Sequence, residues 1–249
     1  MKLGICYNLF DGEELLEPNV KNVRKFVDYI SVIFQKTSYF GNTINFDILY
    51  KLHKNKLIDD IIEYKNDLSL NPKINEVNIR NLGLSYSIKN NCSYHISADI
   101  DEFYEDLTFV KKEIQKYDSS VVYLENYFKD PTYQITPSQN HITTFIHSTN
   151  LFYQLKENYP YKIDLSRRLN NYEKCRVFNK EEFIIHHYSY VRKNINFKID
   201  NSLNWLRNKN NFKEKFHNYQ VGNILNVPPD FNNRRTKIAK DIFNLKGLL

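Results

Sequence analysis

The chain has 249 residues, of which 41% are hydrophobic and 26% charged, so it can bury one sizeable core, with or without a small appendage. Its net charge of +6 is spread along the chain, which disfavours nucleic-acid binding because that function calls for a dense basic stripe. No apolar run approaches the roughly 20 residues of a membrane-spanning helix, and residues 1–8 lack the pattern of a secretory signal.

The chain opens with a predicted strand, helix and second strand. Residues 3–7 form an apolar run that suits a buried strand. Acidic residues at 11–14 are typical of a helix N-terminus, and apolar residues between 15 and 27 recur at helical spacing. Residues 29–34 are β-branched and aromatic, which indicates a second strand. This succession predicts a parallel sheet with a right-handed crossover.

The next elements lead to an acidic strand end. We predict helices over residues 46–64 and 75–90, because apolar side chains repeat with a helical period in both. A strand over residues 93–98 then ends directly in Asp99-Ile100-Asp101-Glu102.

The second half of the chain has a less regular pattern. It predicts, in chain order, a helix over residues 109–117, strands over 121–127, 145–153, 175–178 and 183–190, and an amphipathic helix over 197–216 with Leu203, Leu206 and Phe212 on one side. A short final helix is expected after Pro228 and Pro229. The whole succession predicts an α/β fold with a central mixed sheet flanked by helices and a C-terminal helical segment.

The cysteines are odd in number and far apart. Cys6, Cys92 and Cys175 lack the spacing of a metal-ligand pair, so we expect neither a disulfide framework nor a zinc ribbon. This favours a reducing, cytoplasmic setting, which would be the host cytoplasm for a viral protein.

The sharpest chemical feature is the group of three carboxylates Asp99, Asp101 and Glu102 at the end of an apolar strand. In open α/β sheets, ligands bind at the carboxyl ends of the strands. Close carboxylates repel one another, and a bound divalent cation relieves that repulsion. Oxygen ligands suit Mg²⁺ or Mn²⁺, which then neutralise a diphosphate. The alternative interpretation is an acidic turn without a metal.

An upstream motif makes a family recognisable. The sequence Arg80-Asn81-Leu82-Gly83 on a helix, then a strand, then Asp99-Ile100-Asp101 resembles the nucleotide-sugar half of GT-A fold glycosyltransferases, especially the family-2-like group. The variant Asp-Ile-Asp-Glu-Phe-Tyr at 99–104 is similar to a set of phage and viral glycosyltransferase-like proteins. The match covers roughly residues 1–105 and continues more loosely through 161–193.

The resemblance implies one GT-A-like domain over residues 1–249. Its nucleotide-sugar half spans 1–105, its acceptor half 106–195 and its C-terminal helical appendage 196–249. The donor-binding residues implied are Asn8, Asp11, Gln35, Arg80, Asn81, Asp99 and Arg192, and Arg167 is a further candidate for positive charge beside the diphosphate. Many relatives have an acidic residue for the base where this chain has Gln35, so the base is left open. A solvated helix face is the alternative for Arg80 and Asn81.

A late strand supplies a candidate third metal ligand. His186 and His187 are adjacent, and neighbouring strand residues face opposite sides of a sheet, so only one of them can point into a site. The order His187-Tyr188-Ser189 resembles the His-aromatic-small sequence at the metal-ligating histidine of several GT-A enzymes. We therefore predict a metal site of Asp99, Asp101 and His187, whose imidazole favours Mn²⁺ over Mg²⁺. The alternative is a pair of buried structural histidines.

Two carboxylates are candidates for the catalytic base. Asp164 precedes Arg167 and Arg168, whose charges would lower its pKa, and it could serve as base or acceptor ligand. Glu125 lies near the end of a predicted strand and is the other candidate. A salt-bridged turn is the alternative for Asp164. Only an inverting reaction requires such a base.

These features predict a metal-dependent glycosyltransferase. It would move a sugar from a nucleoside diphosphate sugar, such as a UDP- or GDP-sugar, to a hydroxyl of a glycan or other acceptor, with Mn²⁺ or Mg²⁺ as cofactor. One rival is a non-catalytic sugar-binding or virion-structural protein with the same fold. Another is a metal-dependent phosphodiesterase or nuclease, which needs a second metal site roughly 4 Å from the first. The sequence leaves the donor sugar, the acceptor, the stereochemical course and the oligomeric state open.

Overall fold

The computed structural model describes residues 1–38, 40–43, 46–202, 209–225 and 233–248. Its first elements are β1 (Leu3–Leu9), η1 (Glu13–Leu15), α1 (Leu16–Val23), β2 (Tyr29–Phe34), α2 (Asp47–Lys54), β3 (Asp60–Glu63), α3 (Pro72–Lys89), β4 (Tyr94–Asp99) and β5 (Glu102–Phe103). They are followed by α4 (Thr108–Glu113), η2 (Ile114–Lys116), β6 (Ser119–Phe128), β7 (Tyr133–Thr136), β8 (Ile142–Ser148), η3 (Leu165–Arg167), β9 (Cys175–Val177), β10 (Ile184–Tyr190), α5 (Ile195–Asp200), α6 (Lys209–Asn218) and β11 (Arg235–Ile238).

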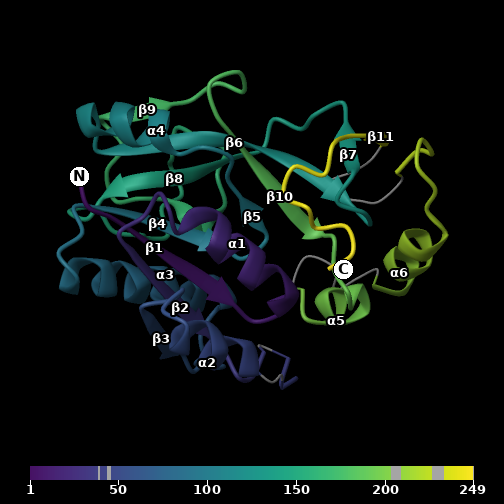
Figure 1. Cartoon of the computed structure of the whole chain (residues 1–249), viewed down its shortest axis with the longest axis horizontal. Helices are drawn as coiled ribbons and strands as arrows, with labels where there is room; N and C mark the ends of the chain where they lie inside the picture. The colour runs from purple at the N-terminus through teal and green to yellow at the C-terminus, as the bar shows by residue number, and fades with distance from the viewer. Residues whose placement is uncertain (39, 44–45, 203–208, 226–232, 249) are drawn as a thin grey trace.

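One mixed sheet organises the molecule. Its strands run in the order β11-β7-β6-β8-β4-β1-β2-β3, with β10 beside β5 and β6 and with β9 beside β6. The neighbours β4, β1, β2 and β3 are parallel, whereas β8 is antiparallel to both β4 and β6. The predicted mixed sheet is therefore confirmed, and so is the parallel pairing of the first two strands. Figure 1 shows α1, α2, α3 and β1–β4 toward one end and β7, β11, α5 and α6 toward the other.

Helices cover both faces of the parallel strands. Ile5 and Tyr7 of β1 belong to the largest core cluster together with Val20 of α1, whereas Cys6 packs with Ile79 of α3 in a separate cluster. Alternate side chains of a strand point to opposite faces, so β1 has α1 on one side and α3 on the other. The predicted flanking helices are thus present.

One predicted helix is wrong in its second half. The helix expected over residues 46–64 ends at Lys54, and Ile61 and Ile62 lie on β3, where they pair with Val32 and Ile33 of β2. Two adjacent β-branched residues gain more from pairing at the edge of a parallel sheet than from a helix. The apolar spacing fitted both states, as short apolar patterns can.

The second half forms a smaller core of its own. Aromatic and aliphatic side chains from β6, β7, β10, α5 and α6, among them Phe128, Ile135, Tyr190, Ile199 and Phe212, pack together there. The helix predicted over 197–216 is two helices, α5 and α6, and Leu203 and Leu206 lie outside the described residues. Residues 233–248 contain β11 and turns in place of the predicted final helix.

The cysteines and helices agree with the sequence pattern. Cys6, Cys92 and Cys175 are all free thiols. In the described part of the chain, no helix combines the length and the apolar character needed to cross a bilayer.

Candidate functional site

A cavity of about 460 Å³ opens where β1 and β4 end. The two strands are in parallel register, with Asn8 opposite Asp99, so side chains far apart in the sequence meet at one sheet edge. Such an edge is where open α/β sheets bind ligands. The predicted site residues that line this cavity are Asn8, Asp11, Gln35, Arg80, Asp99, Asp101, Asp164, His187 and Arg192.

Helix α3 brings Arg80 to the cavity. Asn71 caps the helix by accepting a hydrogen bond from the Lys73 N–H, and Pro72 occupies the first turn. Gly83 allows a close approach to β1, because a Cβ there would lie 2.5 Å from the Cys6 Sγ. The Arg-Asn-x-Gly spacing thus has a packing reason, since it holds Arg80 one turn before the contact point.

Arginines hold Asp99 from two sides. Arg80 donates to Oδ1 of Asp99 at 3.3 Å and to the Ser97 hydroxyl at 3.0 Å, while Arg167 donates to Oδ2 of Asp99 at 2.6 Å. Partial burial would raise the pKa of Asp99, but the charges of Arg167 and Arg80 hold it well below its usual range. The carboxylate therefore stays ionised, and 39% of the side chain remains exposed toward the cavity.

Arg167 also binds the third carboxylate of the motif. Its guanidinium donates to both oxygens of Glu102, at 2.6 and 3.3 Å, and to the Thr143 hydroxyl at 3.0 Å. Burial raises the pKa of Glu102, and the negative charges of Asp99 and Asp101 add to this effect. Glu102 is thus a buried support for Arg167.

Arg192 fixes Asp101. Its guanidinium donates to Oδ2 of Asp101 at 2.6 Å, and both side chains are buried. Gly12 leaves room for the arginine, because a Cβ at that position would lie 2.7 Å from the Arg192 Nε. Gly12 also has a φ of 77°, a conformation that favours glycine. The loop after β1 is therefore shaped around Arg192.

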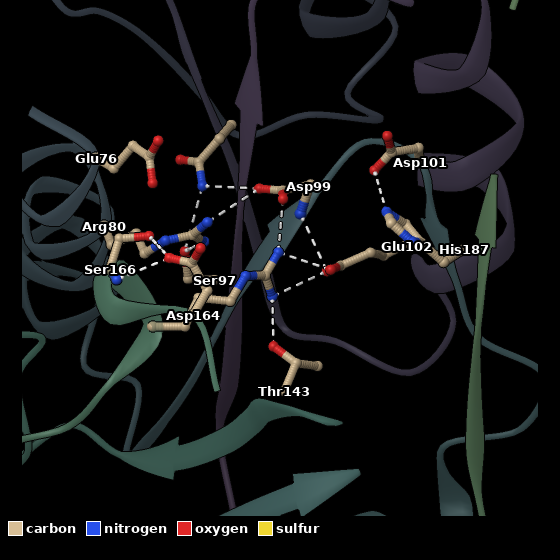
Figure 2. Close-up of polar contacts among 12 residues, drawn as sticks. Glu76, Arg80, Ser97, Asp99, Asp101, Glu102, Thr143, Asp164, Ser166 and His187 are labelled. Atoms are coloured by element: carbon tan, nitrogen blue, oxygen red, sulfur yellow. Dashed lines mark hydrogen bonds and ion pairs between the residues drawn. The ribbon is translucent and has the colours of Figure 1, made fainter. Parts of the chain in front are cut away.

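His187 faces the other oxygen of Asp101. Its Nε2 lies 3.7 Å from Oδ1 of Asp101, as Figure 2 shows, and Oδ1 is buried without a hydrogen-bond partner among the described residues. Asn126 donates its amide to Gln139 at 2.9 Å, which leaves its Oδ1 to accept from Nδ1–H of His187 at 2.7 Å. Burial lowers the pKa of His187 despite the charge of Asp101, so the ring is neutral. Its Nε2 consequently carries a lone pair directed at a carboxylate.

The donor set of this pair suits a divalent cation. A metal-ligating histidine usually donates its second ring nitrogen to a fixed acceptor, and Asn126 supplies that acceptor here. In residues 1–248 as far as they are described, however, no three His, Cys, Asp or Glu side chains converge as metal ligands. The predicted three-residue site is thus not preformed, because Asp99 is turned toward Arg80 and Arg167. Asp101 and His187 remain as a two-residue donor set.

His186 and Glu125 do not line the cavity. Nδ1 of His186 lies 2.9 Å from the Tyr127 hydroxyl, and its Nε2 lies 3.0 Å from Glu105. Glu125 alternates along β6 with Leu124, which does line the cavity, so Glu125 points to the opposite face of the sheet. The prediction of Glu125 as catalytic base is therefore wrong in position. Its sequence position near a strand end did not reveal its face.

Asn81 also lies away from the cavity. Its amide donates to the Tyr153 carbonyl, and its carbonyl accepts from the Tyr153 N–H, both at 2.8 Å. Asn81 thus ties α3 to the segment after β8. Its predicted role in donor binding does not fit this arrangement.

Asp164 does line the cavity, but its partner is not the one predicted. Its carboxylate lies 2.9 Å from Nζ of Lys73 and caps η3 by accepting from the Ser166 N–H. Burial alone would raise the pKa of Asp164, but the charge of Lys73 and the hydrogen bonds from Lys73 and Ser166 lower it to about 2. Arg167 turns instead to Asp99, and Arg168 donates to backbone carbonyls such as that of Ile163.

A second cavity of about 280 Å³ adjoins the first. Its walls include Gln35, whose Oε1 accepts from the Asn66 amide at 2.6 Å, and the ring of Phe10. Phe10 stacks on Phe197 of α5, with ring centroids 5.8 Å apart. The residues that line both cavities are Phe10, Asp11, Gln35, Lys73, Glu76, Ile79 and Lys198.

Lys73 and Lys198 were missed in the sequence. Lys73 starts α3 one turn and more before Arg80, and Lys198 lies on α5, almost 100 residues after Asp101. Both belong to lysine-rich, polar stretches that offer no local signal. Only the packing of α5 over the end of β1 brings Lys198 to this sheet edge.

Comparisons with known proteins give distant structural likenesses. No family model and no curated protein sequence matches the chain. It is similar to the crystal structure of S. aureus TarS 1-349, with 12% identity and a TM-score of 0.44, over 82% of this chain and 66% of that one. The S. aureus TarS crystal structure gives 12% and 0.44, over 87% of this chain and 43% of that one. Mannose-1-phosphate geranyltransferase from Thermus thermophilus gives 11% and 0.30, over 60% and 50%. The chain thus spans less than two thirds of the length of these structures.

Proposed function

We propose that the chain is a metal-dependent glycosyltransferase, which moves a sugar from a nucleoside diphosphate sugar to a hydroxyl of an acceptor. One observation carries the proposal. The unpartnered Oδ1 of Asp101 faces the lone pair of Nε2 of His187 inside a cavity at the carboxyl ends of parallel strands. Two electron-rich atoms at this distance call for a cation between them.

Asp101 and His187 would hold Mn²⁺ or Mg²⁺ together with oxygens of the donor's diphosphate. An imidazole ligand favours Mn²⁺, because Mg²⁺ prefers oxygen. When bound, the metal would act as a Lewis acid on the leaving diphosphate. Arg192 keeps Asp101 ionised and oriented through its contact of 2.6 Å.

Asp99 would act on the donor without joining the metal. Its carboxylate is ionised, partly exposed and fixed by Arg80 and Arg167. A fixed carboxylate that faces a cavity accepts hydrogen bonds from hydroxyl groups. The ribose of the donor is the hydroxyl-bearing group we assign to it. The neighbouring cavity, with Phe10 and Gln35 in its walls, would take the nucleobase.

The acceptor side falls to Asp164 and its surroundings. A general base works best when its pKa lies near the operating pH, and the pKa of Asp164 is about 2. Asp164 is therefore a weak base, and we assign it to positioning the acceptor together with Lys73. A retaining course, which needs no acceptor base, fits this assignment best.

Donor hydrolysis tests the function. A panel of UDP- and GDP-sugars should be hydrolysed slowly in the presence of Mn²⁺ and without acceptor, and Asp101→Asn should abolish this turnover. The matched control is Asp106→Asn, which makes the same charge change at an exposed position five residues later. A wild-type protein that binds no nucleoside diphosphate and hydrolyses no sugar of the panel would contradict the proposal. Cleavage of phosphodiesters instead would favour the nuclease alternative.

A further inference from the structure

Helix α5 places one lysine at the junction of the two cavities. Asn194 caps the helix by accepting from the Phe197 N–H at 3.0 Å, and Ile195 and Ile199 are buried in the smaller core. Phe197 stacks on Phe10, which follows β1. These contacts fix the stem of Lys198, whose side chain lines both cavities.

The ammonium of Lys198 has no close partner among the described residues. Its nearest carboxylate oxygens there are Oδ1 of Asp11 at 3.7 Å and Oδ2 of Asp101 at 4.0 Å, both too distant for a hydrogen bond. The other cations that line the cavities, within the described ranges, are each bound to a carboxylate at 3.3 Å or less. They are Arg80 at 3.3 Å from Asp99, Arg167 at 2.6 Å from Asp99, Arg192 at 2.6 Å from Asp101 and Lys73 at 2.8 Å from Glu76.

The two nearby carboxylates are themselves incompletely paired. Oδ2 of Asp11 and Oδ1 of Asp101 are both buried without a hydrogen-bond partner in the described part of the chain. A site that holds an unpaired ammonium beside unpaired carboxylate oxygens is complementary to a ligand that brings both signs of charge. A diphosphate with its divalent metal is such a ligand, because the metal satisfies a carboxylate while the phosphate oxygens face the lysine.

The position of Lys198 agrees with that ligand. A nucleoside diphosphate sugar has its diphosphate between the nucleoside and the sugar. If the nucleoside occupies the cavity of about 280 Å³ and the sugar the one of about 460 Å³, the diphosphate crosses their junction. Of the two lysines at that junction, Lys73 is already bound to Glu76 and Asp164. Lys198 is the one available to an anion.

We propose that Lys198 is a phosphate-binding residue of this site, which donates from α5 to the diphosphate of the donor. This inference rests on the proposed function for the identity of the ligand. The contact between Lys198 and a diphosphate stands on the charges and distances of the junction alone.

Calorimetric titration with inorganic pyrophosphate, UDP and GDP, each with Mn²⁺, tests the inference. Lys198→Met should weaken binding of pyrophosphate and of the preferred nucleotide about 10- to 100-fold, as expected for loss of a charge-assisted hydrogen bond. Lys198→Arg should retain most of the affinity. Lys193→Met removes the same charge from an exposed lysine five residues earlier and should change nothing. Circular dichroism would verify that the variants are folded.

The outcomes separate the two proposals. Wild-type affinity for pyrophosphate and nucleotide in Lys198→Met would overturn the role of Lys198 and leave the proposed function intact. Pyrophosphate binding that depends on Lys198, without binding of UDP or GDP, would keep the anion site and remove the proposed function. A wild-type protein that binds none of the three would overturn both.

Discussion

Nε2 of His187 lies 3.7 Å from Oδ1 of Asp101, and neither atom has a hydrogen-bond partner among the described residues. The imidazole is oriented from behind by Asn126, and the carboxylate is oriented from its other oxygen by Arg192. Both supports act on the far atom of each group, so the two near atoms are left facing each other. This is the arrangement expected of two ligands prepared for one cation.

The adjacent histidines provide a matched test of that arrangement. His187→Ala should weaken Mn²⁺-dependent binding of nucleoside diphosphate about tenfold or more, because outer- and inner-sphere changes at metal sites typically cost 10- to 100-fold in affinity. It should also reduce the preference for Mn²⁺ over Mg²⁺, since the nitrogen ligand is lost. Calorimetric titrations with each metal measure both effects.

His186→Ala is the control for that experiment. Its ring contacts Tyr127 and Glu105 on the other face of the sheet, so the variant should lose stability and keep the metal preference. An equal loss of Mn²⁺-dependent binding in both variants would refer the effect to the strand β10 and remove His187 from the ligands.

Asp164→Asn should separate acceptor chemistry from donor binding. The asparagine can still accept from the Ser166 N–H and keep the cap of η3, while the ion pair with Lys73 is lost. Sugar transfer should fall about tenfold, and nucleotide affinity should change less than about twofold, because a charged hydrogen bond typically contributes about 1.5–3 kcal/mol. Single-turnover transfer and calorimetry measure the two quantities. Equal losses in both would assign Asp164 to the fold alone.

The same residue should leave no trace in the pH dependence of the reaction. The pKa of Asp164 is lowered to about 2, so its carboxylate is ionised throughout the usual assay range. The acid limb of the pH–rate profile should therefore fall at the same pH in the wild type and in Asp164→Asn. A limb that disappears in the variant would show Asp164 titrating as the catalytic base.

The buried His147 should make the fold sensitive to acid. Burial lowers its pKa from 6.5 to about 4, so between these values the unfolded chain binds the extra proton. Stability should thus be complete above pH 6.5 and decrease as the pH falls toward 4, by up to about 3 kcal/mol for this group. In His147→Gln the decrease should be smaller, and in the exposed His53→Gln it should match the wild type. Urea unfolding across the range from neutral pH to the lowered pKa measures it, and an unchanged slope in His147→Gln contradicts it.

Local pattern was sufficient for much of the first half of the fold. The first two predicted strands coincide with β1 and β2 because their residues are apolar and β-branched and pack on both faces. The end of β4 at Asp99 was also predictable, since polarity changes abruptly there. β3 was missed because its apolar residues also fitted the helical spacing of α2, and only pairing with β2 distinguishes the two states.

The site was predictable where strand ends carry the chemistry. The parallel register of β1 and β4 brings Asn8 and Asp99 together, which follows from any parallel sheet with these ends. Ion pairing was not predictable, because sequence proximity suggested Arg167 and Arg168 for Asp164. The structure pairs Asp164 with Lys73, 91 residues away, and turns Arg167 to Asp99. Such partners depend on how β8, η3 and α3 pack.

Gly83 links the packing of α3 to the geometry of the site. Alanine is about 1 kcal/mol more favourable than glycine inside a helix, so Gly83→Ala would stabilise the protein if there were room. There is none, because the new Cβ would lie 2.5 Å from Sγ and 2.7 Å from Cβ of Cys6 on β1. The helix must move away from the sheet.

Gly83→Ala should therefore destabilise the fold by about 1–3 kcal/mol, the usual cost of overpacking. It should also weaken nucleotide binding, since Arg80 lies one turn away on the same helix and its contact with Asp99 is already 3.3 Å long. Ser85→Ala on the exposed side of α3 is the control and should change stability by less than about 0.5 kcal/mol. Urea unfolding and nucleotide titration of the two variants measure these effects. A more stable Gly83→Ala with wild-type nucleotide affinity would show that close packing of α3 on β1 does not position Arg80.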